Sequence, residues 1–258
     1  MTIRPGGQAA ADHDPMRTLV VIPTYNEKEN LDNIVEQVLG LGVSGLAVLV
    51  VDDASPDGTG EVADRLAERH PEQVSVLHRQ GKLGLGSAYI DGFRLGLERG
   101  FEAVCEMDAD GSHEPASLKE LITAVESGYD VAIGSRRVPG GRTEGWGAHR
   151  ELMSRGAMAL TRLALGLRTH DVTAGFRCFS AAAVRELLKL PIRSSGYAFQ
   201  EEMIFYCERL GLKIKEIPIV FRDRKLGRSK LTPAEVRKFF TIIWYLRRQG
   251  ARIKRLRP

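Results

Sequence analysis

The chain has 258 residues, of which 43% are hydrophobic and 27% are charged, a balance typical of globular proteins and unlike that of disordered, collagen-like or disulfide-framework chains. Its net charge of +4 is too small to indicate a nucleic-acid binder, and its apolar runs fall short of the ~18 residues that a membrane-spanning helix needs. The three cysteines lie far apart without a C-x-x-C motif, which argues against a zinc site and favours a reducing cytosol.

The first residues are rich in Gly, Pro, Ala and polar groups, and they lack the apolar stretch of a signal peptide. We therefore expect residues 1–15 to be a disordered leader. Ordered structure should begin near Met16.

From residue 18 onwards, short apolar runs alternate with stretches that repeat apolar residues at helical spacing. The apolar runs predict strands at 18–22, 46–51, 74–78, 103–107 and 130–134. The stretches between them predict helices at 31–41 and 59–69, from a Gly-rich turn at 81–86 to about residue 99, and at 115–127. Continuous apolar strands between helices are typical of a sheet that is buried on both faces. The sequence thus predicts an α/β fold with a mostly parallel central sheet flanked by helices.

After Gly134 the regular alternation ends in a Gly-rich loop. The elements expected beyond it are helices at 149–167, 181–189 and 199–210, strand-like segments at 173–179 and 213–221, and a last helix from Pro233. These apolar elements are too few for a separate core. We therefore expect residues 16–246 to form a single domain, followed by a basic tail at 247–258.

Two carboxylates, Asp108 and Asp110, follow directly after the strand predicted at 103–107. In an open α/β sheet, the carboxyl ends of the strands line the ligand crevice. Acids at i and i+2 share a face of an extended segment, and Mg²⁺ or Mn²⁺ prefers such oxygen ligands together with water and substrate phosphate. The pair therefore resembles a clamp for a metal-bound diphosphate, although taken alone it is also compatible with a solvated turn.

Polar residues end two more of these strands. Asp52 and Asp53 end the second strand, where one acid is suited to a nucleotide and the other to capping the following turn. Pro23 stops the first strand, and Tyr25 and Glu27 beyond it are suited to stacking on a base and bonding to it. Three strand ends would thus supply polar groups to one crevice.

Several motifs occur in order between Leu19 and Lys230. They are VVIPTYNEKENL, VVDDASPDGT, KLGLGSAY, MDADGSH, IGSRR, the W-x-x-x-R-x-x-x-SRGA segment, TAGFRCF, YAFQEEM and F-R-D-R-K-x-G-x-SK. Together they resemble the family 2 glycosyltransferases, and more narrowly the dolichyl-phosphate or polyprenyl-phosphate mannosyltransferases, which have a GT-A fold. The resemblance implies transfer of mannose from GDP-mannose to a polyprenyl or dolichyl monophosphate, with inversion at the anomeric carbon and with Mg²⁺ or Mn²⁺ as cofactor.

The resemblance also assigns residues to the donor. Positions that match the family's nucleotide contacts are Pro23, Tyr25, Glu27, Val51 and Asp53. Positions that match its metal and diphosphate ligands are Asp108 and Asp110, with the backbone of Ala109 alongside. Ser112 stands where the family often has Gln or Ser.

Positively charged side chains match the family's phosphate ligands. Arg136 matches a ligand of donor and acceptor phosphates, while Arg224 and Lys230 match basic residues that reach the sugar diphosphate. Because a phosphate acceptor is already an anion, its attack needs relief of charge repulsion more than a general base. Arg150 and Ser154 lie at i and i+4 of a predicted helix, so they are expected to hold one phosphate together, with a surface arginine stripe as the alternative for Arg150.

We expect catalysis to depend on Asp110 and Arg136. Glu201 or Glu202 could orient the sugar. Helix capping or a solvated position are the alternatives for these two acids.

A polyprenyl acceptor is too apolar to leave the bilayer, so the enzyme must work at the membrane surface. The helix at 149–167 has an amphipathic composition with basic anchors, and residues 239–246 form a second apolar segment before the basic tail. Either segment could instead belong to the core or contact another protein. Because the sequence ends at Pro258 without the transmembrane helices of some relatives, we expect peripheral binding at the cytoplasmic face of the membrane, directly or through a membrane-protein partner.

Two other functions are compatible with these motifs. A polyprenyl-phosphate glucosyltransferase that uses UDP-glucose would share almost all of them, and competition between the two sugar nucleotides would separate the two activities. A non-catalytic nucleotide-sugar-binding or membrane-scaffold protein predicts indifference to Asp110→Ala. Nucleic-acid binding fits least, because the basic tail lacks interleaved aromatic residues.

Overall fold

The computed structural model of the chain describes residues 15–194, 196, 198–223 and 241–249. Four expectations lie outside these residues: the leader up to residue 14, the roles of Arg224 and Lys230, the start of the last helix at Pro233, and the basic tail beyond residue 249.

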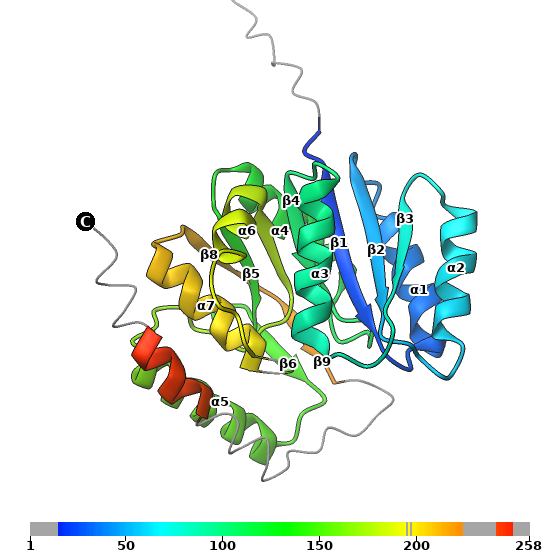
Figure 1. The fold of residues 1–258 in the computed structure, drawn as a ribbon. Helices are drawn as coiled ribbons and strands as arrows, with labels where there is room; N and C mark the ends of the chain where they lie inside the picture. Colours follow the sequence, from blue (N-terminus) through cyan, green and yellow to red (C-terminus); the bar gives the residue numbers. More distant parts are fainter. Residues whose placement is uncertain (1–14, 195, 197, 224–240, 250–258) are drawn as a thin grey trace, which may run out of the picture.

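A seven-stranded sheet forms the centre of the fold (Figure 1). Its strands are β1 (Thr18–Thr24), β2 (Leu46–Asp52), β3 (Val74–His78), β4 (Ala103–Glu106), β5 (Val131–Ser135), β7 (Arg177–Ser180) and β8 (Ile214–Pro218). The spatial order is β3-β2-β1-β4-β7-β5-β8, and every neighbouring pair is parallel except the pairs that β7 makes with β4 and β5. The prediction of a mostly parallel sheet is confirmed.

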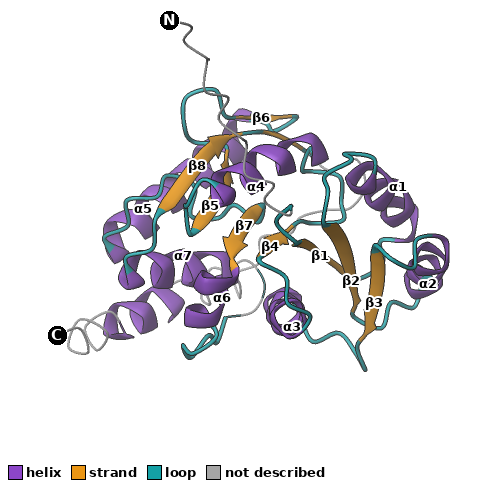
Figure 2. Ribbon diagram, turned by 90° about the horizontal axis from the view of Figure 1, so that it is seen from above, coloured by secondary structure: helices purple, strands orange, loops and turns teal. Residues whose placement is uncertain are grey.

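Helices cover both faces of this sheet (Figures 1 and 2). On one face lie α1 (Lys28–Leu39), α2 (Thr59–Arg69) and α4 (Leu118–Glu126), the last preceded by a short 3-10 turn (Pro115–Ser117). On the other face lie α3 (Leu85–Glu98), α6 (Ala181–Leu187) and α7 (Ala198–Leu210), and α5 (Ala148–Leu165) adds its buried residues to the same core. Residues 241–249 are also helical, and Ile243 and Leu246 join this core.

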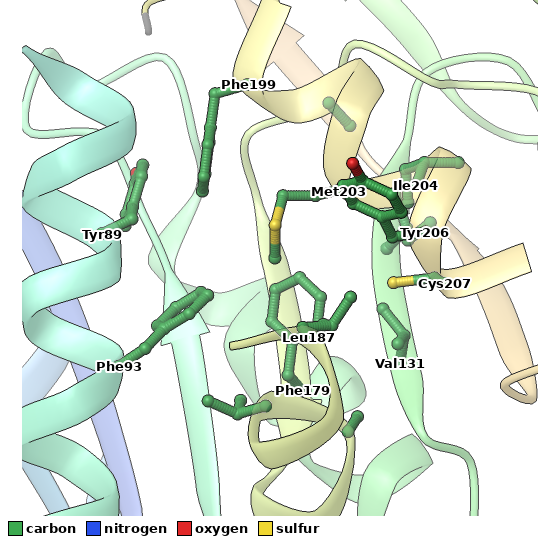
Figure 3. Packing of buried hydrophobic residues seen from close by; sticks show 14 of the residues in the cluster. Tyr89, Phe93, Val131, Phe179, Leu187, Phe199, Met203, Ile204, Tyr206 and Cys207 are labelled. Atoms are coloured by element: carbon green, nitrogen blue, oxygen red, sulfur yellow. The ribbon is translucent and has the colours of Figure 1, made fainter. Parts of the chain in front are cut away.

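The alternation of side chains along each strand explains the two cores. Within β1, Leu19 and Val21 enter the core beneath α3, whereas Val20 and Ile22 enter the core beneath α1 and α2. Figure 3 shows the first core, in which Phe93, Phe179 and Phe199 pack among aliphatic side chains. A strand that is buried on both faces has to be apolar at every position, which is why the sequence pattern identified β1 and β2 so readily.

Three expectations for the second half were wrong in detail. The strand predicted at 173–179 begins only at Arg177, and the segment before it is a loop at the edge of the sheet. The segment predicted as one strand at 213–221 is two strands, since the pairing of β8 with β5 ends at Pro218. The chain then continues as β9 (Val220–Arg222), which pairs with β6 (Arg142–Glu144), a strand inside the loop for which no strand was expected.

The order of the strands determines where a ligand can bind. From β1 the chain proceeds outward to β2 and β3, and it then returns to the opposite side of β1 with β4. Such a reversal leaves a crevice at the carboxyl ends of the two strands that flank it, here β1 and β4. Because β7 runs in the opposite direction, the loop that precedes it reaches this same edge.

Gly92 allows α3 to lie directly against β1, since a Cβ atom at this position would come within 2.5 Å of Val21 Cγ1. We expect Gly92→Ala to lower the free energy of unfolding by about 1–3 kcal/mol, the usual cost of overpacking. Gly156→Ala is the matched control, because Gly156 lies in α5 with nothing within 4 Å of the added methyl group. That change should stabilise the protein by up to about 1 kcal/mol through helix propensity. Urea unfolding of both variants measures the difference, and an equal effect of the two would contradict the close packing of α3.

Candidate active site

Asp108 and Asp110 lie in the turn after β4, half-buried at the crevice. The Asp108 carboxylate accepts a hydrogen bond from the Tyr89 hydroxyl (3.1 Å), and the Asp108 N–H donates to Nδ1 of His113 (3.3 Å). The Asp110 carboxylate accepts the N–H of Ser112 (3.0 Å). Neighbouring groups therefore hold both acids in place.

His113 supports this turn through its hydrogen bond with the Asp108 N–H. Its ring stacks on Phe176 with the centroids 4.9 Å apart and meets Phe221 edge-on at 5.6 Å. Burial lowers the pKa of His113 to about 4 although the nearby Asp110 opposes the shift. The ring is therefore neutral near pH 7, which leaves Nδ1 able to accept the Asp108 N–H.

A divalent cation fits these two acids only together with a substrate. Among the described residues, no group of three or more His, Cys, Asp or Glu side chains could hold a metal ion. Mg²⁺ in particular is commonly held by one or two carboxylates while phosphate oxygens and water complete its coordination. The donor set of Asp108 and Asp110 therefore suits a metal that arrives with a diphosphate.

On the opposite side of the crevice, Tyr25 and Glu27 follow β1 and are half-buried. The ammonium group of Lys82 lies over the Tyr25 ring, 3.7 Å from its centroid. The Glu27 carboxylate accepts a hydrogen bond from the Asn30 side chain (2.8 Å), and the Glu27 N–H donates to Thr59 (3.0 Å). Tyr25 thus lies beside the loop that precedes α3.

The structure distinguishes the two acids after β2. Asp52 accepts the N–H and the hydroxyl of Ser55 (3.2 and 2.6 Å), so it caps the turn. Asp53 is 5% exposed and accepts from Arg79 (2.6 Å) and from the N–H groups of Leu83 and Gly84 (3.2 and 2.9 Å). Asp53 therefore anchors the loop that carries Lys82.

Pro23 and Val51 are partners in the register of β1 and β2. Pro23 is half-buried at the end of its strand, whereas the side chain of Val51 is fully buried in the core. Ala109, between the two acids, is also buried. Any contact of Val51 with a nucleotide must come from its backbone.

Arg136 follows β5 and is held by Asp171 from the loop before β7. Its N–H, Nε and Nη2 donate to the Asp171 carboxylate at 2.9, 2.7 and 2.6 Å, and Nη2 also donates to Thr173 (2.7 Å). Burial alone would raise the pKa of Asp171, but the hydrogen bonds and charge of Arg136 hold it below the ordinary value. The guanidinium is only 7% exposed and lies 5.1 Å from the centroid of the Phe221 ring. Its orientation is thereby determined by the loop that precedes β7.

Next to Arg136 is a hollow of about 450 Å³ lined by residues 136–141 and Arg155. Two of its cations, Arg137 and Arg155, both form ion pairs with Glu151, and Arg136 is paired with Asp171. The arginines outnumber the acids that neutralise them, so the hollow is suited to an anion.

Arg150 and Ser154, which we expected to hold one phosphate together, are bonded to different neighbours in the structure. Arg150 pairs with Asp223 (2.8 Å) and lies 4.1 Å from the centroid of the Trp146 ring, whereas Ser154 accepts a hydrogen bond from Arg137 (3.2 Å). Both residues are on α5 at i and i+4, but each side chain is directed to a different neighbour. Arg137, which the sequence did not single out, is therefore the cation that meets Ser154.

Glu201 and Glu202 are only 5% and 0% exposed, which excludes a solvated position for either acid. Glu202 accepts the N–H groups of Arg193 and Ser194 (3.1 and 2.7 Å), so it holds the loop before α7 rather than capping the helix. Burial raises the pKa of Glu201 to about 7, opposed by the charge of the buried Arg177. Both acids therefore belong to the interior of the protein.

Residues at the site that the sequence-based candidates did not include are Tyr89, His113, Arg137 and Asp171. Each lies inside or next to a motif that was recognised, but the residue type alone did not indicate which side chain it would contact. Tyr89 reaches Asp108 across 19 positions and Asp171 reaches Arg136 across 35, so only the fold brings them together.

Comparison with known proteins gives concordant results. The model of the Glycosyl transferase family 2 domain matches residues 19–188. The polyprenol monophosphomannose synthase of Mycolicibacterium smegmatis is 44% identical over 233 residues, which are 90% of this chain and 88% of that protein. The undecaprenyl-phosphate mannosyltransferase of Micrococcus luteus is 49% identical over 217 residues, 84% of this chain and 88% of that protein.

Among solved structures, the chain resembles glucosyl-3-phosphoglycerate synthase from Mycobacterium tuberculosis in complex with Mn²⁺, uridine-diphosphate-glucose and phosphoglyceric acid. The TM-score is 0.68 at 20% identity, and the match covers 95% of this chain and 85% of that one. At this identity the likeness bears on the fold alone, and it confirms the expected GT-A architecture.

Proposed function

The chain belongs to glycosyltransferase family 2, and we propose that it transfers mannose from GDP-mannose to a polyprenyl monophosphate, with inversion at the anomeric carbon. The identity of 44 and 49% to two enzymes named for mannose transfer to such lipids supports the acceptor and the sugar. The observation that carries the proposal is that a pair of carboxylates and a group of arginines lie at the same edge of the sheet. The carboxylates of Asp108 and Asp110 follow β4, and the cationic hollow beside Arg136 follows β5.

The reaction joins two anions, and the proposed roles follow from their repulsion. An oxygen of the acceptor phosphate forms a bond to the anomeric carbon while the bond from that carbon to GDP breaks, and GDP leaves with the electron pair. Asp108 and Asp110 would hold Mg²⁺ or Mn²⁺, which supplies charge stabilisation for the leaving diphosphate. Arg136, oriented by Asp171, would hold the phosphates in line, with Arg137 and Ser154 beside it. Arg224 and Lys230 remain proposed donor ligands.

The proposal is tested by incubating the protein with labelled GDP-mannose, Mg²⁺ or Mn²⁺ and a short polyprenyl phosphate, followed by organic extraction. Acid-labile label in the organic phase is the expected result. Unlabelled UDP-glucose in excess should leave the transfer unchanged. Transfer from labelled UDP-glucose in place of GDP-mannose would assign the chain to a glucosyltransferase instead, and no transfer from either donor would contradict the enzymatic function.

We further propose that α5 and residues 241–249 form the surface that meets the cytoplasmic face of the membrane. Of the residues in α5, only Met158, Thr161 and Leu165 are buried. The large apolar side chains that remain exposed on this surface are Leu152 (71%), Met153 (57%), Leu160 (43%), Leu163 (84%) and Trp244 (58%). Met158 and Leu165 of α5 belong to the same core cluster as Ile243 and Leu246. The Arg248 guanidinium lies 4.0 Å from the centroid of the Trp244 ring.

An apolar surface with basic and aromatic residues at its margin is typical of helices that lie in the membrane interface. None of the helices formed by the described residues is long and apolar enough to cross a bilayer. This surface is therefore the part of the described structure best suited to an acceptor that stays in the lipid.

Leu163→Glu is expected to weaken binding to vesicles that contain anionic lipid by about tenfold or more, because burial of one leucine contributes about 1.5–3 kcal/mol. Sedimentation with the vesicles measures the change. Gln73→Glu is the control, since it adds the same negative charge at an exposed residue just before β3, at the opposite edge of the sheet. Transfer to a short, water-soluble acceptor should be retained in both variants. Equal vesicle binding by both variants would contradict the proposed membrane surface.

A further inference from the structure

Tyr89 is the aromatic residue that connects the hydrophobic core to the candidate metal site. It lies in α3, is fully buried, and its ring stacks on that of Phe199 in α7, with the centroids 6.0 Å apart and the planes 11° from parallel. Figure 3 shows the two rings facing each other, with Phe93 one turn further along α3. The Tyr89 hydroxyl points out of this cluster and donates a hydrogen bond to Asp108 Oδ1 (3.1 Å).

The backbone around Tyr89 is closely fitted to its neighbours. A Cβ atom at Gly86, one turn before Tyr89, would come within 2.7 Å of the Ser194 carbonyl oxygen and 2.8 Å of the Phe199 ring. A Cβ atom at Gly92, one turn after it, would meet Val21 at 2.5 Å. Glycine at both positions lets α3 approach α7 and β1 closely. The position of the Tyr89 hydroxyl is therefore determined by packing on both sides.

The apolar cluster by itself explains the ring of Tyr89 but not its hydroxyl. A phenylalanine would make the same ring contacts, and a buried hydroxyl needs a hydrogen-bond partner to offset its desolvation. Asp108 is the partner that the structure provides. A carboxylate that binds a metal is commonly oriented by such a bond to one of its oxygens, and loss of such a bond typically costs 10- to 100-fold in metal affinity.

We propose that Tyr89 is a positioning residue of the metal site, which acts by holding the Asp108 carboxylate in the orientation that binds the cation. The inference rests on the proposed function, in which Asp108 is a metal ligand. It adds a residue from the core, outside the crevice, whose hydroxyl sets the affinity for the metal and leaves the nucleotide contacts unchanged.

The test compares the full chain with Tyr89→Phe by titrating Mn²⁺ in the presence of GDP and following free Mn²⁺ by electron paramagnetic resonance. We expect the variant to bind Mn²⁺ about 10- to 100-fold more weakly. Its affinity for GDP in EDTA should match that of the wild type. In the transfer assay, the Mn²⁺ concentration at half-maximal rate should rise by a similar factor while kcat at saturating Mn²⁺ changes little.

Tyr206→Phe is the matched control. Tyr206 is also fully buried in the same cluster, but in α7, and the substitution removes the same atom without touching Asp108. It should leave Mn²⁺ affinity unchanged, and urea unfolding of both variants shows whether the lost hydroxyl affects folding alone.

The outcomes separate this inference from the proposed function. Wild-type Mn²⁺ affinity in folded Tyr89→Phe, or a parallel loss of Mn²⁺ and metal-free GDP binding, would overturn the positioning role and leave the metal site in place. Failure of the wild type to bind Mn²⁺ with GDP would overturn the metal site and the inference together. Weakened Mn²⁺ binding in a chain that transfers no mannose would support Tyr89 while contradicting the proposed reaction.

Discussion

Asp110→Ala is expected to reduce mannose transfer by about 10³-fold or more at saturating GDP-mannose and metal. The substitution removes one of the two carboxylates that would hold the cation, and the cation would contribute several kcal/mol to stabilising the leaving diphosphate. Asp110 also accepts the Ser112 N–H, so the turn after β4 loses one of its internal hydrogen bonds. Label recovered in the organic phase per unit time measures the effect.

Asp32→Ala is the control for this experiment. Asp32 lies on α1, where it pairs with Arg69 at the surface, and 55% of its side chain is exposed. Removal of this acid should leave transfer and folding close to those of the wild type. A non-catalytic protein would be indifferent to both changes, and an Asp110→Ala variant that retains more than a tenth of the wild-type rate would contradict the role given to Asp110.

Asp171→Ala is expected to lower the free energy of unfolding by about 3–5 kcal/mol, because it leaves the buried guanidinium of Arg136 without its counter-ion. The two side chains are 0% and 7% exposed, and the carboxylate accepts three hydrogen bonds from Arg136. Transfer should also fall, since the orientation of Arg136 depends on this carboxylate. Urea unfolding measures the first effect and the lipid-extraction assay the second.

Asp223→Ala provides the comparison for Asp171, because it removes another aspartate that pairs with an arginine. Here the side chains of Arg150 and Asp223 are 40% and 31% exposed, so solvent screens the pair and the expected loss is at most about 1 kcal/mol. Equal losses of unfolding free energy for the two variants would contradict the larger stabilisation that we assign to the buried pair.

The same pair makes a prediction about pH. In the folded protein the pKa of Asp171 is lowered below the ordinary value of 3.8, so the unfolded chain takes up the proton first as the pH falls. The stabilisation by Asp171 is therefore fully present above pH 3.8 and is lost as the pH falls towards the lowered value in the folded state. Unfolding free energies measured from pH 5 downwards should fall more steeply for the wild type than for Asp171→Asn. Parallel curves would contradict this assignment.

Strand positions in the first half of the chain were predictable for a physical reason. A strand buried on both faces must be apolar throughout, and β1, β2 and β4 lie close to the runs predicted for them. Strand positions in the second half were harder to predict, because β7 is antiparallel and short and because β6 and β9 pair outside the main sheet. Short strands of this kind have little periodicity to detect.

What the sequence determined by itself is the chemistry available at the strand ends: the acids after β4, the aromatic residue and acid after β1, and the arginines after β5. Local order of residues along the chain is enough for this, because parallel strands bring their carboxyl ends to one edge. Which partner each of these groups meets was decided only by the tertiary structure. Arg136 meets Asp171 because β7 runs against its neighbours and carries the preceding loop to that edge. Asp108 meets Tyr89 because two glycines let α3 pack closely against α7 and β1. The spacing of residues along the sequence does not encode this close packing.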